Sequence, residues 1–123
     1  MALDVLIIDD SAAIRKILQR VLLQANIGVG KIHEANDGQE GLSRMASEPV
    51  GLVLSDINMP NMDGLEFLKA MKANPDWKSV PVLMVTTEGS QDKVIQALQL
   101  GASGYVKKPF TPEQIKEKLA TAF

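Results

Sequence analysis

Two acidic residues directly follow an apolar run near the start of the chain. The run from Val5 to Ile8 ends in Asp9 and Asp10, and no basic residue precedes them. Adjacent carboxylates repel each other and raise each other's pKa unless a cation neutralises them. Hard oxygen ligands of this kind suit Mg²⁺ better than a softer metal. The pair therefore indicates a cation site.

Three later apolar runs also end in polar residues. Asp56 and Asn58 follow one of them, Thr86 ends the next, and Lys107 and Lys108 follow the last. Phosphoryl transfer uses this combination of groups. An aspartate can act as the nucleophile, Mg²⁺ and a lysine neutralise the charge on the phosphoryl oxygens, and a hydroxyl donates a hydrogen bond to one of them. The residue types predict a site that forms an aspartyl phosphate.

The apolar runs have the length and composition of strands that are buried on both faces. Between them, apolar residues recur at helical spacing, most clearly from Ile14 to Leu22. This alternation predicts an α/β protein with a parallel sheet and helices on both faces. In such sheets a site lies beyond the carboxyl ends of the strands, where the polar residues fall. The predicted strands cover residues 3–8, 29–34, 51–55, 80–86 and 104–106.

Helix starts are marked by pairs with the spacing of a capping box, in which an N-cap side chain and the third helical residue satisfy each other's backbone amides. These pairs are Asp37 with Glu40, Asp63 with Glu66, and Thr111 with Gln114. Pro112 then falls at the first helical position, where its missing N–H costs nothing. The pairs mark the starts of the helices that follow the second, third and fifth strands.

The composition describes one ordinary globular domain. The chain has 123 residues, of which 46% are hydrophobic and 23% charged, a content that argues against disorder. A net charge of −2 gives no basic surface for nucleic acid, and the absence of cysteine excludes disulfides and thiolate metal sites. No apolar stretch approaches the length of a membrane span. We expect a cytoplasmic protein that contacts neither nucleic acid nor membrane.

Each of the polar residues also has a purely structural explanation. Asp9 and Asp10 could be solvated at a strand end with Ser11 as an N-cap, and Asp56 could cap a turn. Thr86 is an ordinary strand residue, and lysines at a sheet edge reach into water. Taken together, complementary groups at several strand ends of one parallel sheet favour the functional interpretation.

Four separated stretches carry a resemblance to a known family: IIDDS, LSDINMPNMDG, MVTTEG and GASGYVKKPFTPEQ. In their order and spacing the chain resembles the receiver domain of bacterial response regulators, and most of all the stand-alone, CheY-like members. The resemblance covers essentially the whole chain. It implies one receiver domain over residues 1–123 without an output domain, and a flavodoxin-like sheet of five parallel strands in the order 2-1-3-4-5, with five helices on its two faces.

The resemblance implies roles for particular residues. Asp56 accepts a phosphoryl group from a histidine kinase. Asp10, Asp56 and the backbone carbonyl of Asn58 bind Mg²⁺ directly, and Asp9 acts mainly through water. Lys108, which directly precedes Pro109, contacts the phosphoryl group. The protein then catalyses only its own phosphorylation and dephosphorylation and is not an enzyme for other substrates.

Further residues match positions that control the response. Thr86 and Tyr105 correspond to the switch pair of the family, in which the hydroxyl moves toward the phosphate and the ring turns inward. Asn58, Thr87 and Glu88 resemble residues that tune the lifetime of the phosphoryl group. The pattern implies a population shift on the surface formed by the fourth helix, fifth strand and fifth helix.

Two residues depart from the family pattern. Ser55 stands where an apolar residue is more common, and strand alternation predicts that it faces away from the phosphorylation pocket. Thr87 stands where alanine or glycine is frequent, so its extra bulk is expected to restrict access to Asp56.

The implied partners are a histidine kinase and an output protein, for which the flagellar motor switch of chemotaxis is the first expectation. We expect a monomer, or a weak dimer that forms on activation. A phosphohydrolase with an aspartyl-phosphate intermediate would need a cap segment that this chain lacks. A nucleotide-binding module would need GxxxxGK[ST] or GxGxxG, and neither occurs. A degenerate receiver is disfavoured because the acids, Thr86 and Lys108 are all present.

Overall fold

The computed structural model describes residues 3–86, 91–107 and 110–122. Five parallel strands form one sheet in the order β2-β1-β3-β4-β5, which confirms the flavodoxin-like topology. The strands are β1 (Leu3–Ile8), β2 (Val29–Ala35), β3 (Leu52–Ser55), β4 (Val82–Thr86) and β5 (Gly104–Lys107). β1 pairs with β2 on one side and with β3 on the other. The chain passes from β1 to β2 and then crosses back to β3, so the strand order reverses between β1 and β3.

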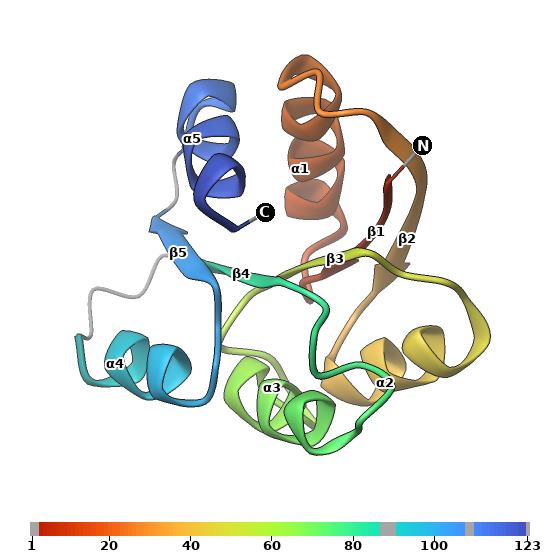
Figure 1. The fold of residues 1–123 in the computed structure, drawn as a ribbon, viewed down its shortest axis with the longest axis vertical. Coiled ribbons are helices and arrows are strands. Elements are labelled where there is room, and N and C mark those ends of the chain that lie inside the picture. Colours follow the sequence, from red (N-terminus) through yellow and green to blue (C-terminus); the bar gives the residue numbers. More distant parts are fainter. Residues whose placement is uncertain (1–2, 87–90, 108–109, 123) are drawn as a thin grey trace.

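Helices cover both faces of the sheet (Figure 1). α1 and α5 lie together on one face, and α2, α3 and α4 lie on the other. The helices are α1 (Ala12–Gln24), α2 (Gly38–Ser47), α3 (Gly64–Ala73), α4 (Gln91–Gln99) and α5 (Pro112–Ala122). None of the helices in the described ranges is long and apolar enough to cross a membrane.

The strands divide their side chains between two apolar clusters because successive residues point to opposite faces. In β1, Val5 and Ile7 pack under α1 and α5, whereas Leu6 and Ile8 pack under the other three helices. All four are fully buried, as are the residues of β3 and β4. Burial on both faces explains why the strands read as continuous apolar runs in the sequence.

The observed strand bounds differ slightly from the predicted ones, for local reasons. β4 begins at Val82 rather than at Val80, because the Val80 amide bonds to the carbonyl of Trp77 and Pro81 has no amide to offer. β5 extends by one residue, to Lys107, which pairs with Thr86 of β4. The predicted alternation of strands and helices is confirmed.

The predicted capping boxes form in two cases and half-form in the third. Asp63 with Glu66 and Thr111 with Gln114 each make both hydrogen bonds. Asp37 accepts from the Glu40 amide at 2.9 Å, but the Glu40 carboxylate turns to the Asn36 amide group instead. The exception lies beside the candidate site, where Asp37 has a second partner.

Candidate functional site

Three carboxylates meet where the strand order reverses. Asp9 follows the last residue of β1, Asp10 comes next, and Asp56 follows the last residue of β3. One carboxylate oxygen from each lies within 4.8 Å of the others. Asp9 is buried, Asp56 is half-buried and Asp10 is exposed, so the group opens to solvent on one side. This confirms the predicted convergence of the acids.

The pairing of β1 with β3 sets the spacing of these acids. Ile8 stands opposite Ser55 in the parallel register, and the Asp56 amide continues the ladder by donating to the Ile8 carbonyl at 2.9 Å. Asp9 and Asp56 therefore leave neighbouring strands at the same level. A shift of one residue in either strand would turn one carboxylate to the other face of the sheet.

Backbone amides orient two of the carboxylates. The Asp9 carboxylate accepts from the Ser11 amide at 2.9 Å, and the Asp56 carboxylate accepts from the Ile57 amide at 2.7 Å. Ser11 is the N-cap of α1 and accepts from the Ile14 amide. The backbone itself thus orients these two carboxylates.

Arg15 fixes the backbone behind the acids, a role the sequence analysis did not predict. Its guanidinium donates to the Asp9 carbonyl at 2.6 Å, to Glu34 at 2.9 Å and to Asn36 at 2.9 Å. Its side chain is 12% exposed, and the Glu34 contact is an ion pair. Arg15 therefore ties α1 to the carboxyl ends of β1 and β2. The sequence did carry a signal for this role, because Arg15 lies one helical turn after the N-cap Ser11.

The loop between β3 and α3 carries Asn58 and is held from two sides. The Gly64 amide donates to the Ile57 carbonyl at 2.7 Å, which closes the loop at its base. Asn61, which has a φ of 65°, donates from its side chain to the Asp37 carboxylate at 2.8 Å. The Gly38 amide donates to the Met62 carbonyl at 2.9 Å. The N-terminus of α2 therefore anchors the loop that follows Asp56.

Thr86 and Tyr105 lie on neighbouring strands, Thr86 at the carboxyl end of β4 and Tyr105 as the second residue of β5. Thr86 ends β4 and is fully buried. Tyr105 stands opposite Met84 in the register and is half-buried against the cluster below α2, α3 and α4. The Lys118 ammonium lies 5.6 Å from the centre of its ring. The ring thus lies on the α2/α3/α4 face of the edge strand β5, within reach of the ammonium of Lys118 from α5.

Ser55 and Asn58 flank Asp56 in different surroundings. Ser55 is fully buried, and its hydroxyl donates to the backbone carbonyl of Asp56 at 2.9 Å. Asn58 is exposed, and its side-chain oxygen accepts from Lys93 of α4 at 2.7 Å. Lys93 is not predicted from the sequence, because helical spacing alone does not indicate which loop a lysine reaches.

Comparison with known proteins agrees with this geometry. Residues 5–120 match the family model of the response regulator receiver domain. The chain belongs to the response regulator receiver family. It is 40% identical over 119 residues to the chemotaxis protein CheY of Pseudomonas aeruginosa, covering 97% of this chain and 94% of that protein. It is 38% identical to the chemotaxis protein CheY-3 of Vibrio cholerae, covering 97% and 90%.

Solved receivers share the whole fold. The structure of the chemotaxis response regulator CheY4 of Vibrio cholerae superposes with a TM-score of 0.87 at 36% identity, and each chain is covered completely. A response regulator structure from Chloroflexus aurantiacus gives a TM-score of 0.89 at 27% identity, covering 99% of this chain and 98% of that one. This receiver is a CheY-like module of two-component signalling, and the family is one of signalling modules rather than of phosphohydrolases.

Three of the expected site residues of this receiver, Thr87, Glu88 and Lys108, lie outside the described residues. Lys107, which the residue types alone did not separate from Lys108, is exposed at the end of β5. Within the described part of the receiver, the carboxylates of Asp9, Asp10 and Asp56 converge, and Asn58, Thr86 and Tyr105 are the other expected site residues.

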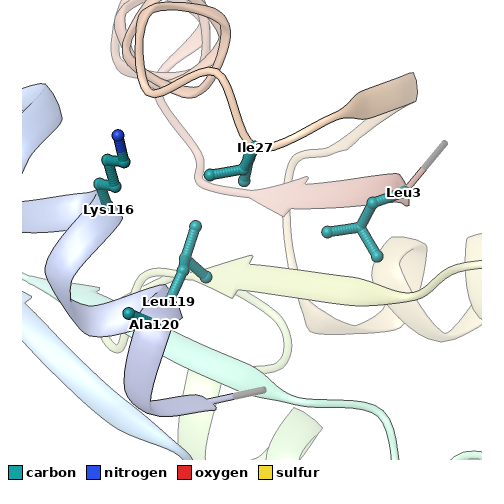
Figure 2. A pocket seen from close by; sticks show the side chains of 5 residues that line it. All are labelled: Leu3, Ile27, Lys116, Leu119 and Ala120. Carbon is teal, nitrogen blue, oxygen red and sulfur yellow. The ribbon is translucent and has the colours of Figure 1, made fainter. Parts of the chain in front are cut away.

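A separate apolar cavity of about 470 Å³ lies away from the acids (Figure 2). It is lined by the side chains of Leu3, Ile27, Lys116, Leu119 and Ala120. Leu3 begins β1, whereas Asp9 follows its end, so the cavity and the acids occupy opposite ends of the sheet. The cavity is not part of the site in this receiver.

The Asp37 anchor gives the receiver a pH-dependent contribution to stability. The side-chain hydrogen bond from Asn61, followed by the amide of Glu40, lowers the pKa of Asp37 from its ordinary value of 3.8, against the opposing effect of burial. A lowered pKa contributes stability above the pKa of the unfolded chain, and this contribution is lost as the pH falls through the folded value.

We expect Asp37→Asn to lower the free energy of unfolding by about 1 kcal/mol at pH 7. Asparagine keeps an oxygen that can accept from the Glu40 amide, but it loses the charged oxygen that accepts from the Asn61 side chain. The difference from wild type is expected to shrink below pH 4. Urea denaturation between pH 7 and pH 3 measures it, with Asp76→Asn as the control for removing an exposed carboxylate. A difference that stays constant over this range would contradict the assignment.

Proposed function

We propose that this receiver is a phosphorylation-controlled switch in which Asp56 accepts a phosphoryl group from a histidine kinase. One observation carries the proposal, namely the convergence of three carboxylates within 4.8 Å at the point where the strand order reverses. Asp56 is the half-buried member of this group, so it combines a fixed orientation with access from solvent. Those are the requirements for a nucleophile that an external donor must reach.

The donor set fits a Mg²⁺ ion. Three clustered carboxylates are hard oxygen ligands, and one of them is exposed, which leaves room for water and phosphoryl oxygens in the coordination shell. Asp10, Asp56 and the Asn58 carbonyl would hold the ion directly, and Asp9 would act mainly through water. When bound, Mg²⁺ supplies positive charge beside the phosphoryl oxygens.

The transfer itself uses the residues of this chain. A carboxylate oxygen of Asp56 attacks phosphorus, the bond between phosphorus and the kinase histidine breaks, and the histidine nitrogen keeps the electron pair and takes up a proton. The Ile57 amide holds the attacking carboxylate from the backbone side. The ammonium of Lys108 and the hydroxyl of Thr86 are proposed to contact the phosphoryl oxygens.

The output is proposed to be a protein contact. The buried Thr86 and the half-buried Tyr105 are proposed to shift together and to change the surface of α4, β5 and α5, with Asn58, Thr87 and Glu88 tuning the phosphoryl lifetime. The similarity to two chemotaxis proteins supports chemotaxis as the pathway, a flagellar motor switch as the target and the cytoplasm as the location.

Phosphorylation by acetyl phosphate tests the proposal. We expect the intact mass of the wild-type protein to rise by one phosphoryl group when Mg²⁺ is present, and the rate to fall on the order of 10²-fold when EDTA removes it, because charge on the phosphoryl oxygens is then left uncompensated. A known active receiver in the same buffers is the positive control. No mass gain in wild type, or a gain that is equally fast in EDTA, would contradict the proposed function.

A further inference from the structure

A lysine of α4 reaches the edge of the site. The Lys93 ammonium lies 2.7 Å from the side-chain oxygen of Asn58, 35 positions away in the sequence. Val94 and Ala97 are buried and hold α4 against the sheet, whereas Ile95 and Leu98 are exposed. Lys93 is half-buried, beside this anchored face. Its position is therefore fixed by the packing of the helix.

The hydrogen bond also fixes the orientation of the Asn58 side chain. An ammonium can only donate, so it must face the oxygen of the carboxamide and not its NH₂ group. The NH₂ group of Asn58 then points away from Lys93. Because the donor is charged, the bond is stronger than one between neutral groups. Asn58 is thus held in one arrangement two residues beyond Asp56.

The hydrogen bond spans two neighbouring strand ends. Asn58 lies in the loop after β3, Lys93 lies in the helix after β4, and these strands are paired in the sheet. Asp56 leaves the end of β3 and is half-buried. The link between the two loops therefore lies at the edge of the sheet that carries Asp56. From there we expect it to border the path by which a water molecule would reach a phosphoryl group on Asp56.

We propose that Lys93 is a positioning residue that acts through Asn58 to slow hydrolysis of the phosphorylated receiver. This inference rests on the proposed function. In the hydrolysis, a water oxygen bonds to phosphorus and the bond between phosphorus and the Asp56 oxygen breaks. The products are the Asp56 carboxylate and inorganic phosphate, with the proton of the water passing to phosphate or solvent. The link restricts the approach of that water and connects α4 to the site.

The lysine charge by itself offers a competing explanation. A positive charge near the site attracts anionic donors and stabilises phosphate whatever Asn58 does. That effect weakens with added salt and persists when the Asn58 side chain is removed. An effect that passes through Asn58 disappears when its side chain is removed, so a double-mutant cycle separates the two explanations.

The experiment compares the decay of the phosphorylated protein across a set of variants. Each protein is loaded with acetyl phosphate and Mg²⁺, the donor is removed, and intact mass and released inorganic phosphate are followed at low and high salt. The variants are Lys93→Met, Lys93→Arg, Asn58→Ala and the double variant of Lys93→Met with Asn58→Ala. Lys69→Met removes an exposed lysine of α3 and is the control.

We expect Lys93→Met to speed the decay up to about tenfold, the upper range for losing one charge-assisted hydrogen bond at a partly exposed site. Lys93→Arg and Lys69→Met should decay like wild type, and the double variant no faster than Asn58→Ala. An unchanged lifetime in Lys93→Met, or the same acceleration with and without the Asn58 side chain, would overturn the inference alone. A wild-type protein that accepts no phosphoryl group would overturn the proposed function and this inference with it.

Discussion

The Asp56→Asn variant is expected to take up no phosphoryl group from acetyl phosphate and yet to remain folded. Its neutral amide cannot act as the nucleophile, so the loss of phosphorylation should be complete. Asparagine keeps an oxygen that can accept from the Ile57 amide, the contact that orients Asp56 at 2.7 Å. The local turn should therefore survive the change.

The same variant should gain stability in the absence of metal. Three carboxylates within 4.8 Å repel one another, and removing one charge relieves about 1 kcal/mol at low salt for a site open to solvent. We expect the free energy of unfolding to rise by that amount in EDTA, and the gain to shrink in Mg²⁺ or high salt. This pairing of lost activity with higher stability excludes misfolding as the cause of the loss.

Intact mass after treatment with acetyl phosphate, combined with urea denaturation, measures both effects. Asp76→Asn removes an exposed carboxylate far along the chain and should behave like wild type in each assay. Phosphorylation of Asp56→Asn at the wild-type rate would mean that another residue is the acceptor. Fragment masses would then identify which carboxylate carries the phosphoryl group.

Gly64→Ala is expected to lower the free energy of unfolding by about 3 kcal/mol, the upper range for inserting one methyl group into a packed site. A Cβ at this position would overlap the backbone carbonyl oxygen of Asp56 and lie 2.9 Å from the Cα of Ile57. Backbone atoms cannot rotate away as a side chain can. The loop that carries Asp56 must therefore shift, and the hydrogen bond between the Gly64 amide and the Ile57 carbonyl must weaken.

A second glycine provides a matched control for this prediction. At Gly104 an added Cβ would meet the Leu83 side chain at 3.4 Å, an ordinary contact, and no other atom of the described residues within 4 Å. Gly104→Ala is therefore expected to change stability by less than about 1 kcal/mol. Urea denaturation gives the stabilities, and the rate of phosphorylation by acetyl phosphate should fall only in Gly64→Ala. Equal stability of Gly64→Ala and Gly104→Ala would contradict the prediction, because the loop that carries Asp56 would then accommodate the added methyl group without loss of stability.

The fold was predictable because its signals are local. Strands such as Leu3–Ile8 are buried on both faces, so they appear as apolar runs, and residues from Ile14 to Leu22 repeat at helical spacing. The parallel sheet then places the ends of β1 and β3 at one edge. The strand order implied by the family resemblance makes β1 and β3 neighbours, so Asp9, Asp10 and Asp56 were expected to meet, and their carboxylates do converge. The roles of Asn58, Thr86 and Tyr105 remain predictions.

The sequence by itself therefore determined the order of the elements and the placement of the acids at strand ends, since both depend on neighbours along the chain. Only the tertiary structure decided the contacts that hold the site, which join Arg15 to Glu34, Asp37 to Asn61 and Asn58 to Lys93. These pairs are 19, 24 and 35 positions apart. Their formation depends on how each helix rotates and packs after its loop, and no periodicity within a single element encodes that.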